Sequence, residues 1–96
     1  RRRTTARARR NRLTGRMERW PVVSSTLRSA GYDAATRTLE LEFTSDRIYR
    51  YFNVPPDIFA ALMSVPSKGY FYNVAIRDFY PRAEVVEGRL GTVKYP

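Results

Sequence analysis

The hydrophobic pattern of the chain changes its period at Pro55-Pro56, and this change constrains the fold more than any other feature. Before the prolines, residues 38–44 alternate strictly between polar and apolar side chains, which is typical of a half-buried strand. After them, residues 57–63 place their apolar side chains at helical spacing, and proline suits the first turn of a helix. The order of the two patterns predicts strands followed by helices, an α+β fold.

Three strands are expected before the prolines, at residues 25–33, 37–43 and 48–54. A loop at residues 34–36 joins the first two. Ser45-Asp46 forms a two-residue turn between the second and the third, because aspartate tolerates left-handed backbone angles. The three strands would form an antiparallel meander.

Two helices are expected after the prolines. Asp57 complements the dipole of the first helix, which Pro66 ends. Ser67 caps the second helix, whose apolar side chains recur at helical spacing as far as Tyr80, and Pro81 ends it. The predicted fold class is a small α+β domain, a three-stranded antiparallel β-meander followed by two helices packed on one face.

The positive charge of the chain is concentrated in its N-terminal segment. The net charge is +9 over 96 residues, but residues 1–19 hold nine arginines and a single acid, Glu18, a net +8. Residues 20–96 are nearly neutral at +1. We therefore expect an arginine-rich arm at 1–19, flexible or ordered by a partner, a folded domain at 20–81, and a C-terminal tail at 82–96 with room for one short strand.

The arm carries the strongest sequence signal for a partner. A run of arginines without acids binds RNA or DNA backbone without reading sequence, or remains a solvated tail. The candidate phosphate contacts are Arg1, Arg2, Arg3, Arg7, Arg9, Arg10, Arg12 and Arg16. The composition also resembles an organellar transit peptide, and Met17 suits the start of a domain, so residues 1–16 are alternatively an upstream extension. No apolar run approaches the roughly 20 residues that cross a membrane, and we expect a cytoplasmic protein.

Residues 49–51 alternate aromatic and basic side chains on the third strand. With a two-residue turn before them, Tyr49 and Tyr51 share the outer face of the sheet with carboxylates, Tyr49 opposite Glu42 and Tyr51 opposite Glu40. The core face would then consist of Leu39, Leu41, Phe43, Ile48 and Phe52. Because carboxylates repel phosphates, we interpret the tyrosines first as ordinary surface or a protein-contact face, and second as a stacking platform for bases.

In the same register, Arg50 points to the apolar face opposite Leu41. Its guanidinium either extends past the edge of the core or pairs with a carboxylate such as Asp78 or Asp57. A third alternative is a bulge that shifts the register and turns the tyrosines inward. We favour a buried ion pair and keep Arg50 as a weaker candidate for nucleic-acid contact.

Ser67-Lys68 begins the second helix, where serine is a routine cap. The free N–H groups there, with Lys68 and Arg77, are alternatively a small phosphate site, whereas serine–lysine catalysis is the least favoured interpretation. The chain has no cysteine and no histidine, which excludes disulfides, Cys/His zinc sites and histidine-based catalysis. The carboxylates are scattered singly. We expect no enzyme activity, no metal and no cofactor.

Several short motifs, in order and spacing, resemble the KTSC domain: "VVSSTLRSAGYD", "LELEF", "YRYFNVP" and "SKGYFYNVAIRDFYP". The resemblance covers roughly residues 22–81, with Tyr49-Arg50-Tyr51 as the central Tyr-x-Tyr hallmark. This family occurs at the C-terminus of some lysyl-tRNA synthetases and as stand-alone bacterial proteins, and its synthetase neighbour implies RNA binding. Asp46 stands where the family usually has a glycine in the hairpin turn.

Together these observations predict a non-enzymatic accessory module that binds RNA or DNA, mainly through the arm. The alternative is a protein–protein interaction module that uses the Tyr49/Tyr51 face or a sheet edge.

Overall fold

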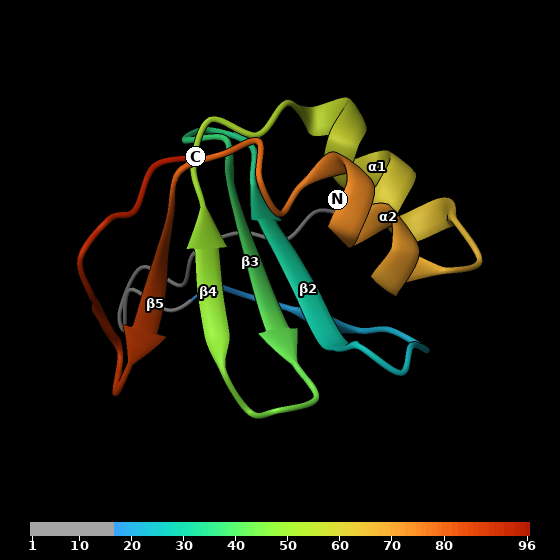
Figure 1. Ribbon diagram of the computed structural model, residues 1–96, viewed down its shortest axis with the longest axis horizontal. Helices are drawn as coiled ribbons and strands as arrows, with labels where there is room; N and C mark the ends of the chain where they lie inside the picture. The colour runs from blue at the N-terminus through green and yellow to red at the C-terminus, as the bar shows by residue number, and fades with distance from the viewer. Residues whose placement is uncertain (1–16) are drawn as a thin grey trace, which may run out of the picture.

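A computed structural model describes residues 17–96, so the predicted contacts at Arg1 to Arg16 lie outside the described residues. The described chain forms one antiparallel sheet in the order β1-β2-β3-β4-β5-β6, with two helices between β4 and β5 (Figure 1). The strands are β1 (Trp20–Pro21), β2 (Leu27–Asp33), β3 (Thr38–Phe43), β4 (Ile48–Tyr51), β5 (Arg82–Val86) and β6 (Arg89–Leu90). The helices are α1 (Pro56–Ser64) and α2 (Lys68–Ala75).

The α+β class and the central meander β2-β3-β4 are confirmed, but the predicted number of strands is wrong. The sheet has six strands among the described residues, not three. The largest difference is β5, which pairs with all four residues of β4 and buries Ala83. We predicted a tail there because residues 82–86 show no clean alternation of apolar and polar side chains.

The first helix has the predicted ends, and the second is shorter than predicted. Pro56 begins α1, and its last residue, Ser64, precedes the C-cap Val65. The Ser67 hydroxyl accepts a hydrogen bond from the Tyr70 N–H at 3.4 Å, so the predicted cap is confirmed. However, α2 ends at Ala75 rather than near Tyr80, and residues 76–80 continue as turns.

The hairpin between β3 and β4 has a three-residue loop, which changes the register. The Phe43 N–H donates to the Arg47 carbonyl at 2.9 Å, and the Asp46 N–H donates to the Phe43 carbonyl at 2.9 Å. Asp46 has a left-handed φ of 74°, which aspartate tolerates better than most residues. Tyr49 therefore lies opposite Leu41, and Tyr51 opposite Leu39. The predicted two-residue turn and its pairing are wrong, and the shifted register that we held as an alternative is present.

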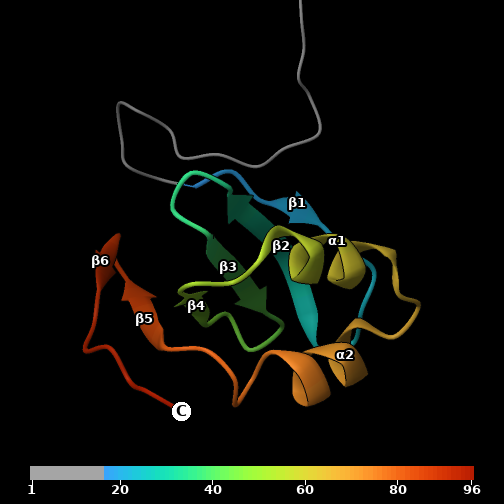
Figure 2. The same ribbon diagram turned by 90° about the horizontal axis from the view of Figure 1, so that it is seen from above.

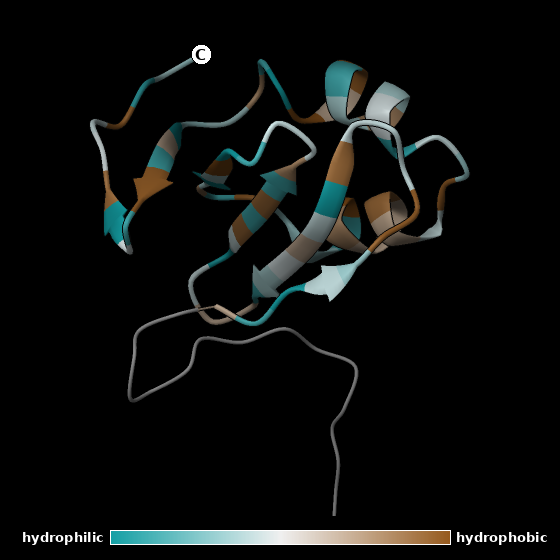
Figure 3. Cartoon of the chain, turned by 90° about the horizontal axis from the view of Figure 1, so that it is seen from below, coloured by the Kyte–Doolittle hydropathy of each residue, from teal (hydrophilic) through white to brown (hydrophobic). Residues whose placement is uncertain are grey.

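The shift moves both tyrosines to the face that the helices cover. Figure 2 shows α1 and α2 beside β2, β3 and β4, with β5 and β6 turned away from them. The fully buried core side chains are Leu27, Leu39, Leu41, Tyr51, Val54, Leu62 and Ile76. Ile48 and Phe52 are only half-buried and lie outside this cluster, so their predicted core role is wrong. Alternating hydrophobic and hydrophilic bands along the sheet reflect the two faces (Figure 3).

Aromatic contacts attach the helices to the sheet. On one side, the Tyr32 ring of β2 stacks on Phe59 of α1 with ring centroids 5.1 Å apart. On the other, Tyr72 of α2 makes edge contacts with Phe43 at 5.2 Å and with Tyr51 at 5.9 Å. Such aromatic pairs contribute about 0.5–1.5 kcal/mol each beyond their area burial.

Candidate nucleic-acid interface

A pocket opens beside α2 on the helix-bearing side of the sheet. It has a volume of about 240 Å³ and receives side chains from the β3–β4 hairpin, from β4, from α2 and the turn after it, and from β5. Its lining residues are Phe43, Ser45, Arg47, Tyr49, Tyr51, Tyr72, Arg77 and Arg82. We call it the arginine pocket. Aromatic rings and guanidinium groups occur together in it, although they come from distant parts of the sequence.

The aromatic part of the arginine pocket is held by ring contacts and one hydroxyl pair. The Tyr49 ring lies 6.0 Å from Phe43 and 6.5 Å from Tyr51, between centroids. The Tyr51 and Tyr72 hydroxyl oxygens are 2.6 Å apart. Burial, together with this hydrogen bond, raises the pKa of Tyr51 well above the ordinary phenol value. Tyr51 is therefore a neutral hydrogen-bonding phenol at physiological pH.

Three arginines supply the positive charge of the pocket. Arg47 lies 3.4 Å from a Glu84 carboxylate oxygen. Arg77 is exposed in the turn after α2, and Arg82 is half-buried on β5 opposite Tyr51. Within residues 17–96, no carboxylate forms an ion pair with Arg77 or Arg82. Unpaired guanidinium groups beside aromatic rings can bind phosphate and stack on a base.

Arg50 lies on the opposite face of the sheet, where it pairs with Glu40. Its Nε donates to a Glu40 carboxylate oxygen at 2.6 Å, and the second oxygen accepts from Arg19. Glu40 is only 3% exposed. Our prediction that Arg50 needs a carboxylate partner is confirmed, but the predicted face and the predicted partners, Asp78 and Asp57, are wrong. The register shift explains the difference, because it carries Arg50 and Glu40 to one face together.

The ion pairs on this face continue beyond Glu40. The Arg19 Nε donates to the Ser29 hydroxyl at 2.9 Å, and Ser29 donates to Glu42 at 2.8 Å. Arg28 lies 3.6 Å from Glu42 and also pairs with Asp46. Because its arginines and carboxylates balance, this face offers little net charge to a polyanion.

Lys68 is held within the fold. Its Nζ donates to the carbonyls of Leu62, Met63 and Val65 at 3.2, 3.2 and 2.9 Å, so it satisfies the C-terminal end of α1. Gly69 beside it has no space for a side chain, because a Cβ there would lie 2.5 Å from the Thr26 hydroxyl oxygen. The structure places Lys68 and Arg77 at different pockets and does not bring them together.

Sequence reasoning identified Arg77 and both tyrosines but missed Arg47 and Arg82. Arg47 belongs to a hairpin whose register was predicted wrongly, and Arg82 to a strand that was predicted as tail. The sequence signal was Asp46 itself: placed as the left-handed last residue of a three-residue turn, it would have positioned Arg47 and the tyrosines correctly. No local sequence signal distinguishes Arg82, because its position depends on β5 pairing with β4.

Within residues 17–96, no helix is long and apolar enough to cross a membrane. In the same residues, no group of three acidic side chains is placed to hold a metal ion.

The fold and the pocket define a small α+β domain in which a six-stranded antiparallel sheet carries two helices on one face. The chain belongs to the KTSC domain family, which matches residues 23–80. A KTSC domain protein from Yersinia pestis has a similar crystal structure, with a TM-score of 0.71 and 35% identity over 72% of this chain and 97% of that one.

Relatives include both separate proteins and part of a larger enzyme. A protein of Stutzerimonas stutzeri, described as uncharacterised, is 46% identical over 69% of this chain and 93% of its own length. A lysine–tRNA ligase of Nostoc punctiforme is 40% identical over 55% of this chain, but the match covers only 9% of the ligase. The family resemblance predicted from the sequence is confirmed.

Proposed function

We propose that this KTSC domain is a non-enzymatic accessory module that binds RNA. The arginine pocket and the arginines of residues 1–16 would contact its phosphates. The observation that carries the proposal is the arrangement of Arg77 and Arg82, without carboxylate partners among the described residues, around the aromatic rings of one pocket. The match to part of a lysine–tRNA ligase, an enzyme whose substrate is RNA, supports RNA over other polyanions.

The chemistry of the pocket fits a nucleotide better than a simple anion. Guanidinium groups bind phosphate through several N–H donors, and a base stacked on an exposed aromatic contributes about 1–3 kcal/mol. The opposite face of the sheet has no comparable excess of positive charge, because its three paired arginines are matched by the carboxylates of Glu40, Glu42 and Asp46. The pocket side is therefore the side on which a nucleic-acid strand would lie.

The structure gives less support to a protein-contact role for the tyrosine face. Tyr51 is only 1% exposed, so it offers little area to a partner. The edge strands β1 and β6 have two residues each, and short edge strands are poor templates for pairing with another chain.

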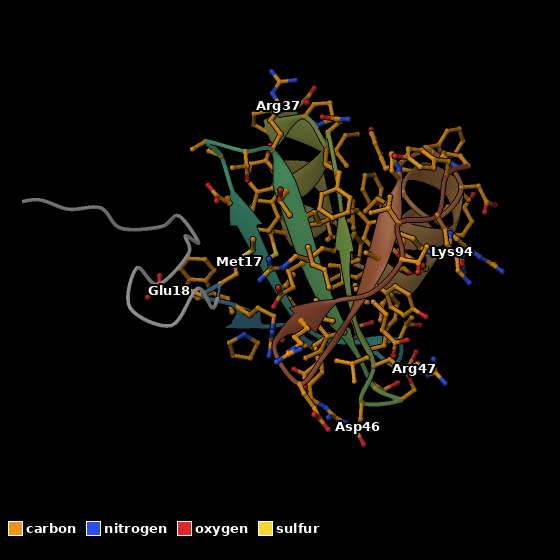
Figure 4. All side chains as sticks on the ribbon, turned by 90° about the vertical axis from the view of Figure 1, so that its left-hand side faces the viewer. Met17, Glu18, Arg37, Asp46, Arg47 and Lys94 are labelled. Atoms are coloured by element: carbon orange, nitrogen blue, oxygen red, sulfur yellow. The ribbon has the colours of Figure 1, made fainter. Side chains whose placement is uncertain are left out.

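Binding to a generic RNA at two salt concentrations tests the proposal. Arg77→Gln and Arg82→Gln should each weaken binding about tenfold, since a charge-assisted contact contributes roughly 1.5 kcal/mol. Each should also make the dependence of log K on log salt less steep, by about 0.7 per lost phosphate contact on a single strand. Arg37→Gln is the matched control, because Arg37 is exposed at the far end of the sheet from Arg47 (Figure 4).

A version that starts at Met17 separates the two parts of the proposal. If it binds more weakly than the full chain but retains the effect of Arg82→Gln, both the arm and the pocket contact RNA. If neither version binds at low salt, RNA binding is wrong. If the full chain binds RNA and the two pocket variants have the same affinity and salt dependence as Arg37→Gln, the arginine pocket is not the site.

A further inference from the structure

A second pocket adjoins the arginine pocket along β5. It has a volume of about 260 Å³ and is formed by β4, β5 and the C-terminal segment 91–94. Its lining residues are Tyr49, Arg82, Ala83, Glu84, Val86, Gly91, Thr92 and Lys94. Tyr49 and Arg82 line both pockets, so the two adjoin each other across β4 and β5, and we call them together the groove.

The far wall of this groove is the C-terminal segment, which backbone hydrogen bonds hold against β5. The Lys94 N–H donates to the Arg82 carbonyl at 2.7 Å, and the Arg82 N–H donates to the Lys94 carbonyl at 2.9 Å. The Gly91 N–H donates to the Glu84 carbonyl at 2.8 Å. Figure 4 shows Lys94 and Arg47 on the same side of the sheet, with Met17 and Glu18 on the other. The wall lies beyond the family match, which ends at residue 80.

Cationic side chains lie along the groove on either side of the Tyr49 ring. Arg77 and Arg47 lie at the α2 end, Arg82 at the centre and Lys94 at the C-terminal wall. The half-buried Tyr49 ring lies where the two pockets join. Glu84 is the carboxylate of the groove lining, and Arg47 already pairs with it. The groove therefore presents cations on both sides of one aromatic ring.

We propose that this groove binds two successive nucleotides of single-stranded RNA, with one base against Tyr49 and the flanking phosphates on the cations at either side. The inference rests on the proposed RNA-binding function and adds the class of RNA. A ring can stack only on a base whose face is free, and the bases of a duplex are stacked on one another. Lys94 would bind a phosphate of the RNA backbone beyond the arginine pocket.

Fluorescence anisotropy of the full chain tests this inference with two probes, a labelled oligouridylate of about twelve nucleotides and the duplex it forms with oligoadenylate. The single strand should bind at least about tenfold tighter than the duplex at the same salt. Lys94→Gln should weaken single-strand binding about threefold and reduce the steepness of its salt dependence by about 0.7. Arg89→Gln, an exposed cation of β6 outside the groove lining, is the control and should have no such effect.

Tyr49 variants test the stacking role. Tyr49→Phe should retain the preference for the single strand, because the ring remains, whereas Tyr49→Leu should lose most of it. Tyr70→Leu removes a tyrosine that is 69% exposed on α2 outside the groove, and it should retain the preference. Thermal unfolding of each variant verifies that the fold persists, and Lys94→Gln decides the case if Tyr49→Leu does not fold.

The outcomes separate the two proposals. Equal affinity for single strand and duplex overturns the single-strand inference and leaves RNA binding intact. An unchanged affinity and salt dependence in Lys94→Gln overturns the two-pocket groove but not the arginine pocket. Absence of binding to either probe overturns both.

Discussion

At the scale of single residues, Tyr51 illustrates how burial changes the chemistry of a side chain. It belongs to the Tyr-x-Tyr hallmark of the family, yet it is 1% exposed and its hydroxyl bonds to Tyr72. Burial is the largest cause of its raised pKa, and burial also raises the pKa of Tyr32. Tyr51 is therefore mainly a core residue, and only a small part of its side chain lines the arginine pocket.

The raised pKa of Tyr51 predicts loss of stability at alkaline pH. Above about pH 10, phenols ionise in the unfolded chain while Tyr51 stays protonated in the folded one, so the unfolded state binds fewer protons. The free energy of unfolding should then fall by up to about 1.4 kcal/mol per pH unit because of this group. Below about pH 9 both states keep the phenol protonated, so Tyr51 contributes its full stabilisation there. Denaturant titrations across this range measure the effect.

Tyr51→Phe is the variant for this test. It should lower stability by about 1 kcal/mol at neutral pH through the lost hydrogen bond to Tyr72, and make the alkaline decline less steep. Tyr70→Phe serves as the control, because Tyr70 is exposed. An alkaline slope in Tyr51→Phe equal to that of the parent protein would contradict the prediction.

At the scale of elements, the β3–β4 hairpin decides which side chains face the helices. One additional residue in the turn reverses the face of every following side chain on β4, since side chains alternate with a period of two. The reversal turns both tyrosines toward the helices, where Tyr51 is buried and Tyr49 half-buried, and it brings Arg50 to Glu40. The helices do not depend on the register of the hairpin, because Pro56 and the Ser67 cap determine where they begin. The end of α2 about one turn earlier than predicted leaves its apolar side chains on the same face.

Substitution of Asp46 tests the turn. Asp46→Ala and Asp46→Gly both remove the ion pair with Arg28, but only alanine adds strain at a φ of 74°. Asp46→Ala should therefore be about 1 kcal/mol less stable than Asp46→Gly, as measured by chemical denaturation. Equal stabilities would contradict the prediction that a Cβ at this left-handed position is strained.

At the scale of the whole molecule, the two faces of the sheet differ in charge and use. One face carries Glu40 and Glu42 among arginines, and the other carries the core and the arginine pocket. The C-terminal segment completes the second face, because β5 supplies Arg82 and the chain after β6 supplies Lys94.

Two C-terminal truncations test the importance of β5 for the fold. A chain that ends at Pro81 should lose stability by several kcal/mol or remain unfolded, since it lacks the strand that pairs with β4 and buries Ala83. A chain that ends at Glu87 retains β5, and its midpoint of thermal unfolding should fall by no more than about 5 °C. If the shorter chain is as stable as the longer one, β5 is not part of the cooperative fold.

Much of this architecture could be predicted from local sequence. Alternation predicted the meander, proline and serine predicted where the helices begin, and Leu39, Leu41, Leu62 and Ile76 were correctly placed on apolar faces. The candidate site could be predicted only in part, because its arginines come from the hairpin, from the turn after α2 and from β5.

The sequence by itself determined the class of fold and the order of the central strands and helices, because these follow from hydrophobic period and from residues with special backbone preferences. Its short motifs, through their resemblance to the KTSC domain, indicated the family. Only the tertiary structure decided the register at Asp46, the recruitment of Arg82–Val86 into the sheet and the pairing of Arg50 with Glu40. The physical reason is that a strand's face and its neighbours depend on contacts between residues far apart in the chain. An alternating pattern shows which side chains of a strand share a face, but it does not show which of the two faces is buried until those contacts form.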